Sequence, residues 1–98
     1  MITLDEKTKQ KIIAVISALM PNVKIYLFGS RARGTNSARA DIDIALDGGK
    51  PLAIEDVDEI KGMFKESNIM YHIDIVDFHQ VSELMRNEIL KERVIWKH

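Results

Sequence analysis

The stretch from residue 41 to residue 47, with the sequence DIDIALD, restricts the fold of this chain more than any other stretch. Ile42, Ile44 and Leu46 stand at every second position, and alternate side chains of a β-strand point to opposite faces of a sheet. These apolar residues therefore predict a strand with one face in the core. The remaining positions form a mostly acidic row on the opposite face, made of Asp41, Asp43, Ala45 and Asp47.

Other segments predict the helices and strands that surround this strand. We expect helices from a capping box at Thr3 and Glu6 to Met20, from Ala53 to about Glu66, and from Val81 to about Ile95. We expect two more strands, over Val23–Phe28 and Tyr71–Phe78, and a turn-rich loop over residues 32–40. This order is typical of an α+β fold with two layers, in which helices cover one face of a small mixed sheet and leave polar residues on the other face.

Composition narrows the classes of protein to which the chain can belong. Its 98 residues fit one domain, so we treat residues 1–98 as a single domain. The formal net charge of −1 gives no general attraction to nucleic acid or to an anionic membrane, and we expect neither as a partner. The absence of cysteine excludes disulfides and is compatible with a cytoplasmic location. The apolar run IIAVISALM is too short to span a bilayer, so we interpret it as an amphipathic helix.

The pair Asp41 and Asp43 is a candidate metal site. Two carboxylates placed two residues apart on a strand point the same way, and each raises the pKa of the other unless a cation lies between them. Mg²⁺ is the hard divalent ion that best matches such ligands. Asp74 alternates with Ile73 and Ile75 in the next predicted strand, and would supply a third carboxylate if the two strands are neighbours. A solvated polar sheet face is the alternative interpretation of this short motif.

Gly29 and Ser30 end the strand before this pair and form a candidate phosphate site. Glycine allows a sharp turn and a close approach of the backbone to a ligand. Ser30 offers a hydroxyl and an N–H group, and a short helical turn that begins there would point further N–H groups at an anion. Arg31 and Arg33 could add charge-assisted hydrogen bonds to phosphate. The alternative is an ordinary turn followed by solvated arginines.

Three other motifs for metals or phosphates fail on the same stretch. An EF-hand loop would need an acidic residue or asparagine at Ala45 and a glutamate at Leu52. A Walker A loop would need a lysine where Thr35 stands. The glycine spacing of a dinucleotide-binding turn is absent as well.

The combined pattern resembles the signature of the DNA polymerase β-like nucleotidyltransferase superfamily. That signature consists of Gly29-Ser30, ten intervening residues, Asp41-x-Asp43, and a later strand that carries Asp74. The whole chain is similar to the smallest members, the minimal nucleotidyltransferases, and the runs LFGSRARG and IDIVD both match.

The resemblance implies a fold, a site and a reaction. The nucleotidyltransferase fold is a mixed sheet flanked by helices. By this resemblance, Asp41 and Asp43 bind two Mg²⁺ ions, and Asp74 completes the site of the catalytic ion. Gly29 and Ser30 hold the β- and γ-phosphates of a nucleoside triphosphate. The reaction implied is the transfer of AMP from ATP to a hydroxyl group.

The resemblance also implies a partner. Minimal nucleotidyltransferases of this size resemble the antitoxin half of a toxin–antitoxin pair, in which AMP is transferred to a tyrosine of a HEPN-domain ribonuclease toxin. Either a homodimer or a hetero-oligomer is compatible with the sequence. Two alternatives stay open, namely a binding module that acts by contact alone and an antibiotic-modifying nucleotidyltransferase. The clustered carboxylates favour an enzyme, and the lack of an acceptor-binding domain counts against the antibiotic-modifying alternative. One departure is Ala40, where many relatives have serine.

Overall fold

The computed structural model describes residues 4–98. In that range the chain alternates helices with strands, and the elements follow one another as α1 (Glu6–Leu19), β1 (Lys24–Phe28), α2 (Ser30–Arg33), β2 (Ile42–Asp47), α3 (Ile54–Glu66), β3 (Ile73–Asp77), α4 (Glu83–Glu92) and β4 (Val94–Lys97). No helix in the described range is long and apolar enough to cross a membrane.

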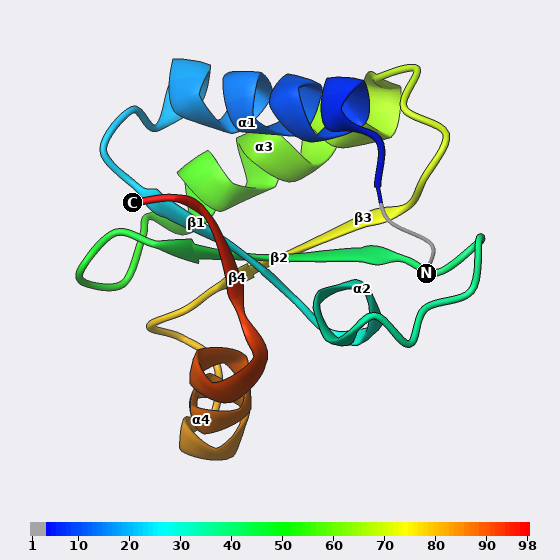
Figure 1. Ribbon diagram of the computed structural model, residues 1–98. Coiled ribbons are helices and arrows are strands. Elements are labelled where there is room, and N and C mark those ends of the chain that lie inside the picture. The colour runs from blue at the N-terminus through cyan, green and yellow to red at the C-terminus, as the bar shows by residue number, and fades with distance from the viewer. Residues whose placement is uncertain (1–3) are drawn as a thin grey trace.

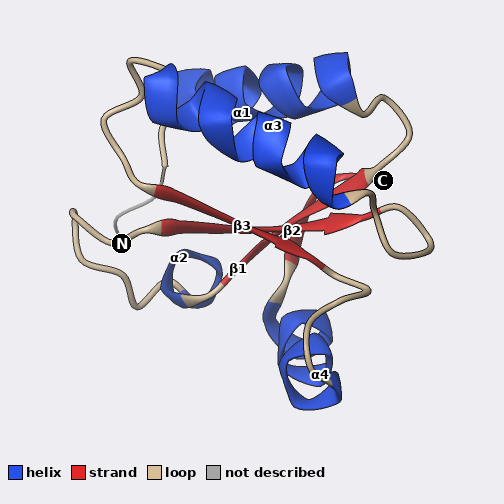
Figure 2. Cartoon of the chain, turned by 180° about the vertical axis from the view of Figure 1, so that it is seen from behind, coloured by secondary structure: helices blue, strands red, loops and turns tan. Residues whose placement is uncertain are grey.

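The strands form one mixed sheet in the order β3-β2-β1-β4. Strands β2 and β3 run parallel, whereas β1 runs antiparallel to both of its neighbours, β2 and β4. Helices α1 and α3 lie on one face of this sheet, and α4 lies on the opposite side (Figures 1 and 2). The expectation of a small mixed sheet flanked by helices is therefore confirmed.

The main core lies between the sheet and the two long helices α1 and α3. The alternation that the sequence predicts is observed, because Ile42, Ile44 and Leu46 are all fully buried. They pack in one cluster with residues of both helices, including Ile12, Ile16, Val57, Ile60 and Phe64. Burial of such side chains supplies the main driving force for folding and fixes β2 in place.

A second, smaller core lies under α4, on the sheet face that the sequence analysis leaves to polar residues. Tyr26, Phe28 and Ala45 are buried there together with Phe78 and Ile89. Helices therefore cover both faces of the sheet and not one face alone, since α4 lies over the middle of this second face. Aspartates lie on either side of this covered region, with Asp41 and Asp43 before Ala45 along the chain and Asp47 after it.

The last predicted helix differs from the observed structure at both ends. Helix α4 begins after Ser82, whose hydroxyl accepts a hydrogen bond from the Met85 N–H, and it ends at Glu92. Residues that were expected to continue the helix form strand β4, which pairs with β1. The run VIW is rich in β-branched and aromatic residues, and pairing with a sheet edge outweighs its weak helix propensity.

The predicted capping box at the first helix differs too. Thr3 lies outside the described residues, and the N-cap of α1 is Asp5. Its carboxylate accepts hydrogen bonds from the N–H and the hydroxyl of Thr8. A helix N-terminus favours an aspartate at this position because the first N–H groups have no partner within the helix.

Candidate active site

The turn at Gly29 brings the end of β1 directly against the carboxylate of Asp43. Phe28, the last residue of β1, pairs with Asp43 across the antiparallel ladder. Gly29 follows with a φ of 79°, a backbone conformation that favours glycine. A Cβ atom placed on Gly29 would overlap Asp43 Oδ2. Both the backbone angle and the lack of space therefore require glycine at this position.

Asp43 also lies beside Asp74, as the sequence predicts. The parallel register of β2 and β3 pairs Asp43 with Asp74, and Asp41 comes two residues before Asp43 on the same face. Burial raises the pKa of Asp43, and the negative charges of Asp74 and Asp41 raise it further. The structure thus brings the three predicted carboxylates to the same end of the sheet.

The three aspartates do not form a closed ligand set by themselves. Among residues 4–98, no group of three or more His, Asp or Glu side chains is arranged closely enough to hold a metal ion. Asp41 is more than half exposed, and its Oδ2 lies 3.4 Å from His72 Nδ1. The donor atoms suit a hard cation, because carboxylate oxygens that repel one another are the ligands that Mg²⁺ prefers.

Ser30 begins the four-residue helix α2 directly after the Gly29 turn, and it is partly exposed. Arg31, in contrast, is buried and points toward the loop that leads to Asp41. Its Nε and Nη2 atoms donate to the Ala40 carbonyl, and its guanidinium lies 4.8 Å from the centroid of the Tyr71 ring. The loop before Asp41 is therefore held through the Ala40 carbonyl. The predicted role of Arg31 in nucleotide binding stays a prediction, beside this observed role in bracing the loop.

Arg33 is bound to a residue that the sequence analysis did not identify. Its Nη1 atom donates to Glu92 Oε2 over 2.9 Å, while Glu92 Oε1 accepts the Gly29 N–H over 2.9 Å. Burial alone would raise the pKa of Glu92, but the bonds from Arg33 and Gly29 hold it below its ordinary value. No motif in the sequence connects Glu92 with Gly29, because the two are 63 residues apart.

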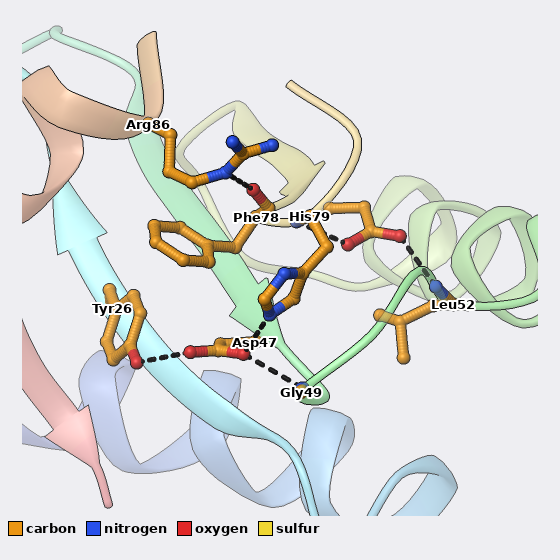
Figure 3. Close-up of polar contacts among 8 residues, drawn as sticks. Tyr26, Asp47, Gly49, Leu52, Phe78, His79 and Arg86 are labelled. Atoms are coloured by element: carbon orange, nitrogen blue, oxygen red, sulfur yellow. Dashed lines mark hydrogen bonds and ion pairs between the residues drawn. The ribbon is translucent and has the colours of Figure 1, made fainter. Parts of the chain in front are cut away.

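The opposite end of β2 carries a second polar cluster, which is shown in Figure 3. Asp47 Oδ2 accepts the Tyr26 hydroxyl over 2.6 Å, and Oδ1 contacts His79 Nε2 over 2.7 Å and accepts the Gly49 N–H over 2.9 Å. Burial alone would raise the pKa of Asp47, but these partners lower it. Burial and the bond to Asp47 raise the pKa of Tyr26 to about 12. Every group in this cluster has a partner of complementary polarity, so the cluster is structural.

Comparisons with known proteins agree with the geometry at the end of the sheet that carries Asp43 and the Gly29 turn. The family model described as "Polymerase beta, Nucleotidyltransferase" matches residues 10–98. The probable protein adenylyltransferase MntA of Haemophilus influenzae is 31% identical over 94 residues, which cover 94% of this chain and 82% of that protein.

Two solved structures have a similar fold. A crystal structure of a toxin–antitoxin with AMP-PNP matches with a TM-score of 0.76 at 27% identity, over 90% of this chain and 71% of that one. A structure of a tri-AMPylated Shewanella oneidensis HEPN toxin in complex with MNT antitoxin matches with a TM-score of 0.74 at 23% identity, over 95% and 71%. At that identity the second match concerns the fold alone.

The family model spans nearly the whole chain, and the Haemophilus influenzae relative aligns over most of both sequences. The resemblance that the sequence motifs indicate is thereby confirmed, and the chain belongs to the polymerase β-type nucleotidyltransferase family.

Proposed function

We propose that this chain transfers AMP from ATP to a hydroxyl group of a partner protein, and that the partner is a HEPN-domain toxin. The observation that carries the proposal is the position of Asp43, which lies between Asp74 on the neighbouring strand and the glycine turn at Gly29. Carboxylates for a cation and a turn suited to phosphate are thus in direct contact. Two similar proteins, a probable protein adenylyltransferase and a toxin–antitoxin solved with AMP-PNP, support a toxin protein as the acceptor, and the HEPN class of that toxin follows from the sequence resemblance.

The triphosphate would bind at the turn that follows β1. The half-buried Ser30 would offer its N–H and hydroxyl to the phosphates, and Gly29 would let them approach the backbone closely. Arg33, whose side chain is 50% exposed, would add N–H donors at the edge of the site. AMP-PNP in a structural relative supports ATP as the donor, and ATP as the donor favours a cytoplasmic location.

Asp41, Asp43 and Asp74 would hold the Mg²⁺ ions. The raised pKa of Asp43 supports this assignment, since a nearby cation would offset both the burial and the repulsion by Asp74 and Asp41 that raise it. When bound, Mg²⁺ neutralises charge on the phosphates and makes the acceptor hydroxyl a better nucleophile. The number of ions, two by resemblance, belongs to the proposal.

The reaction is an in-line substitution at the α-phosphorus of ATP. The acceptor oxygen forms a bond to this phosphorus while the bond to the bridging oxygen of the β-phosphate breaks, and pyrophosphate leaves. The proton of the acceptor hydroxyl passes to Asp74, which we assign as the base because its side chain is exposed on the shared face. The electron pair of the broken bond stays on the leaving pyrophosphate.

The mass of the partner tests this proposal. When chain and toxin are mixed with ATP and Mg²⁺, the intact mass of the toxin should rise by AMP units, and Asp74→Asn should abolish the rise. Asp58→Asn, which changes an exposed aspartate of α3 on the other side of the sheet, is the matched control and should leave the modification unchanged.

A contact-only antitoxin makes the opposite prediction. In that case Asp74→Asn would protect cells from the toxin as well as the original chain does, and the toxin mass would stay constant in both strains. That combination would refute the enzymatic proposal and leave the binding module.

A further inference from the structure

Glu92 joins the last helix to the turn of the candidate phosphate site. Its two carboxylate oxygens bind different parts of that site, because Oε1 accepts the Gly29 N–H and Oε2 accepts Arg33 Nη1, both over 2.9 Å. The Glu92 side chain is only 15% exposed. A carboxylate this well enclosed and bonded holds both of its partners in fixed positions.

The fold fixes Glu92 from both directions along the chain. Ile89, one turn earlier in α4, is fully buried against Tyr26 and Phe28. Immediately after Glu92, Arg93 ends the helix and lies 4.6 Å from the centroid of the Tyr26 ring, and β4 then pairs with β1. The carboxylate therefore stands on a rigid support, which is what a group that orients other groups requires.

We propose that Glu92 is a positioning residue for nucleotide transfer, which holds the Gly29 turn and the Arg33 guanidinium in the arrangement that receives the triphosphate. The inference rests on the proposed function, because it assumes that this turn binds the phosphates. It assigns to Glu92 an action through Gly29 and Arg33, with no contact between Glu92 and the nucleotide.

The guanidinium of Arg33 can serve Glu92 and a phosphate at the same time. Arginine has five N–H donors in a planar fork, and the bond from Nη1 to Glu92 uses one of them. The fork can therefore bridge a carboxylate on one side and a phosphate oxygen on the other. Glu92 fixes the plane of the fork. Its two hydrogen bonds go to Gly29 and Arg33, and neither involves Ser30.

A carboxylate next to an anion site has two opposing effects, and the structure indicates which is larger. Its charge repels the triphosphate, whereas its bonds order the groups that bind the triphosphate. The charge of Glu92 is paired with Arg33 at 2.9 Å, so the pair has little net charge and repels a phosphate weakly. The ordering effect should therefore be the larger one, and removal of the carboxylate should weaken binding.

The test is calorimetric titration of the folded chain with Mg²⁺–AMP-PNP. Glu92→Gln keeps the length of the side chain and an oxygen for the Gly29 N–H, but it loses the ion pair with Arg33. We expect the dissociation constant to rise roughly five- to tenfold. Glu88→Gln makes the same substitution one turn earlier on α4, at an exposed side chain near Lys91, and should leave the constant unchanged.

Arg33→Gln provides a second variant, at a half-exposed position where folding is not at risk. It should weaken binding too, and combining it with Glu92→Gln should add little further loss, because both changes remove one shared arrangement. A Glu92→Gln variant with a lower melting temperature but unchanged or tighter binding would overturn the inference, and so would unchanged binding by Arg33→Gln. Failure of the unmodified chain to bind Mg²⁺–AMP-PNP would instead refute the proposed function.

Discussion

Strand β2 carries two aspartates of the same sheet face in opposite surroundings. The Asp47 carboxylate contacts a hydroxyl, an imidazole and a backbone N–H, and its pKa lies below the ordinary value despite burial. Asp43 is partly buried and lies near the negative charges of Asp74 and Asp41, so its pKa is above the ordinary value for aspartate. The two residues are four positions apart, which is about 13 Å along a strand.

Under the proposed function, this difference separates a structural carboxylate from a functional one. Buried polar groups normally have partners inside the protein, and Asp47 follows that rule. Asp43 is partly buried beside Asp74 and Asp41, whose like charges outweigh the opposite charge of Arg33, and this arrangement lowers stability unless another molecule or ion compensates it. The proposed function assigns the binding of a cation to the Asp43 end of the strand, whereas the Asp47 end connects the sheet to the turn after β3.

The strongest test of the difference between the two ends of β2 is to neutralise the acidic end and measure AMP transfer. Asp41→Asn combined with Asp43→Asn should lower AMP transfer by a factor of about 10³ or more, roughly 4 kcal/mol in activation free energy, because amides hold Mg²⁺ far less well than carboxylates. The measurement is AMP incorporation into the toxin, together with thermal melting in the presence and absence of Mg²⁺–ATP.

The double variant should remain folded, so loss of transfer would not reflect unfolding. Its melting temperature without ligand should equal or exceed that of the unmodified chain, since like charges are removed. Stabilisation by Mg²⁺–ATP should disappear, because a ligand stabilises only the protein that binds it. An undiminished rise of the melting temperature on adding Mg²⁺–ATP would contradict the assignment of both aspartates.

A matched pair of alanine substitutions tests the structural end. Asp47→Ala should lower the free energy of unfolding by about 2–4 kcal/mol, because the buried Tyr26 hydroxyl and the Gly49 N–H lose their acceptor. Asp43→Ala, the same change on the same strand and face, should cost little or even stabilise the chain. Urea denaturation of both variants measures the difference. Equal losses of stability would mean that the two ends are not distinct.

The acidic end was predictable from the sequence because alternation within each strand shows which side chains share a face. Alternation along β2 places Asp41 and Asp43 on one face, and the same alternation with Ile73 and Ile75 places Asp74. The parallel pairing of the two strands then brings them together, as expected. The glycine turn was predictable because it immediately follows a strand.

The remaining contacts depend on how distant elements pack. Glu92 reaches Gly29 only because α4 folds over the second face of the sheet, and β4 then returns along β1. A run as short as VIW has a weak preference that tertiary pairing decides, so the sequence pattern predicts a helix as far as Ile95, where the structure has already begun strand β4. The partners of Asp47 are likewise distant, with Tyr26 and His79 coming from 21 and 32 residues away.

The smallest effect, and the finest test of the comparison, is the pH dependence of stability. The pKa of Asp43 is higher in the folded state than in the unfolded chain, where it is about 3.9. The stability that this residue contributes is therefore fully present below about pH 3.9, and it is lost as the pH rises through the pKa of Asp43 in the folded state. Asp43→Asn removes the charge and should be more stable than the unmodified chain at pH 7 by roughly 0.5 kcal/mol. That advantage should shrink toward pH 3.

Asp47→Asn should show the opposite slope. The folded state lowers the pKa of Asp47, so its contribution is present above about 3.9 and is lost as the pH falls through the folded value. Urea denaturation between pH 3 and pH 7, with a chelator to exclude divalent ions, gives both difference curves from one set of samples. Subtracting the free energy of unfolding of the unmodified chain from that of each variant, at each pH, cancels the titration of the groups that both chains share. Parallel curves for the two variants would show that the environments of Asp43 and Asp47 are alike, and the distinction between a functional and a structural end of β2 would fail.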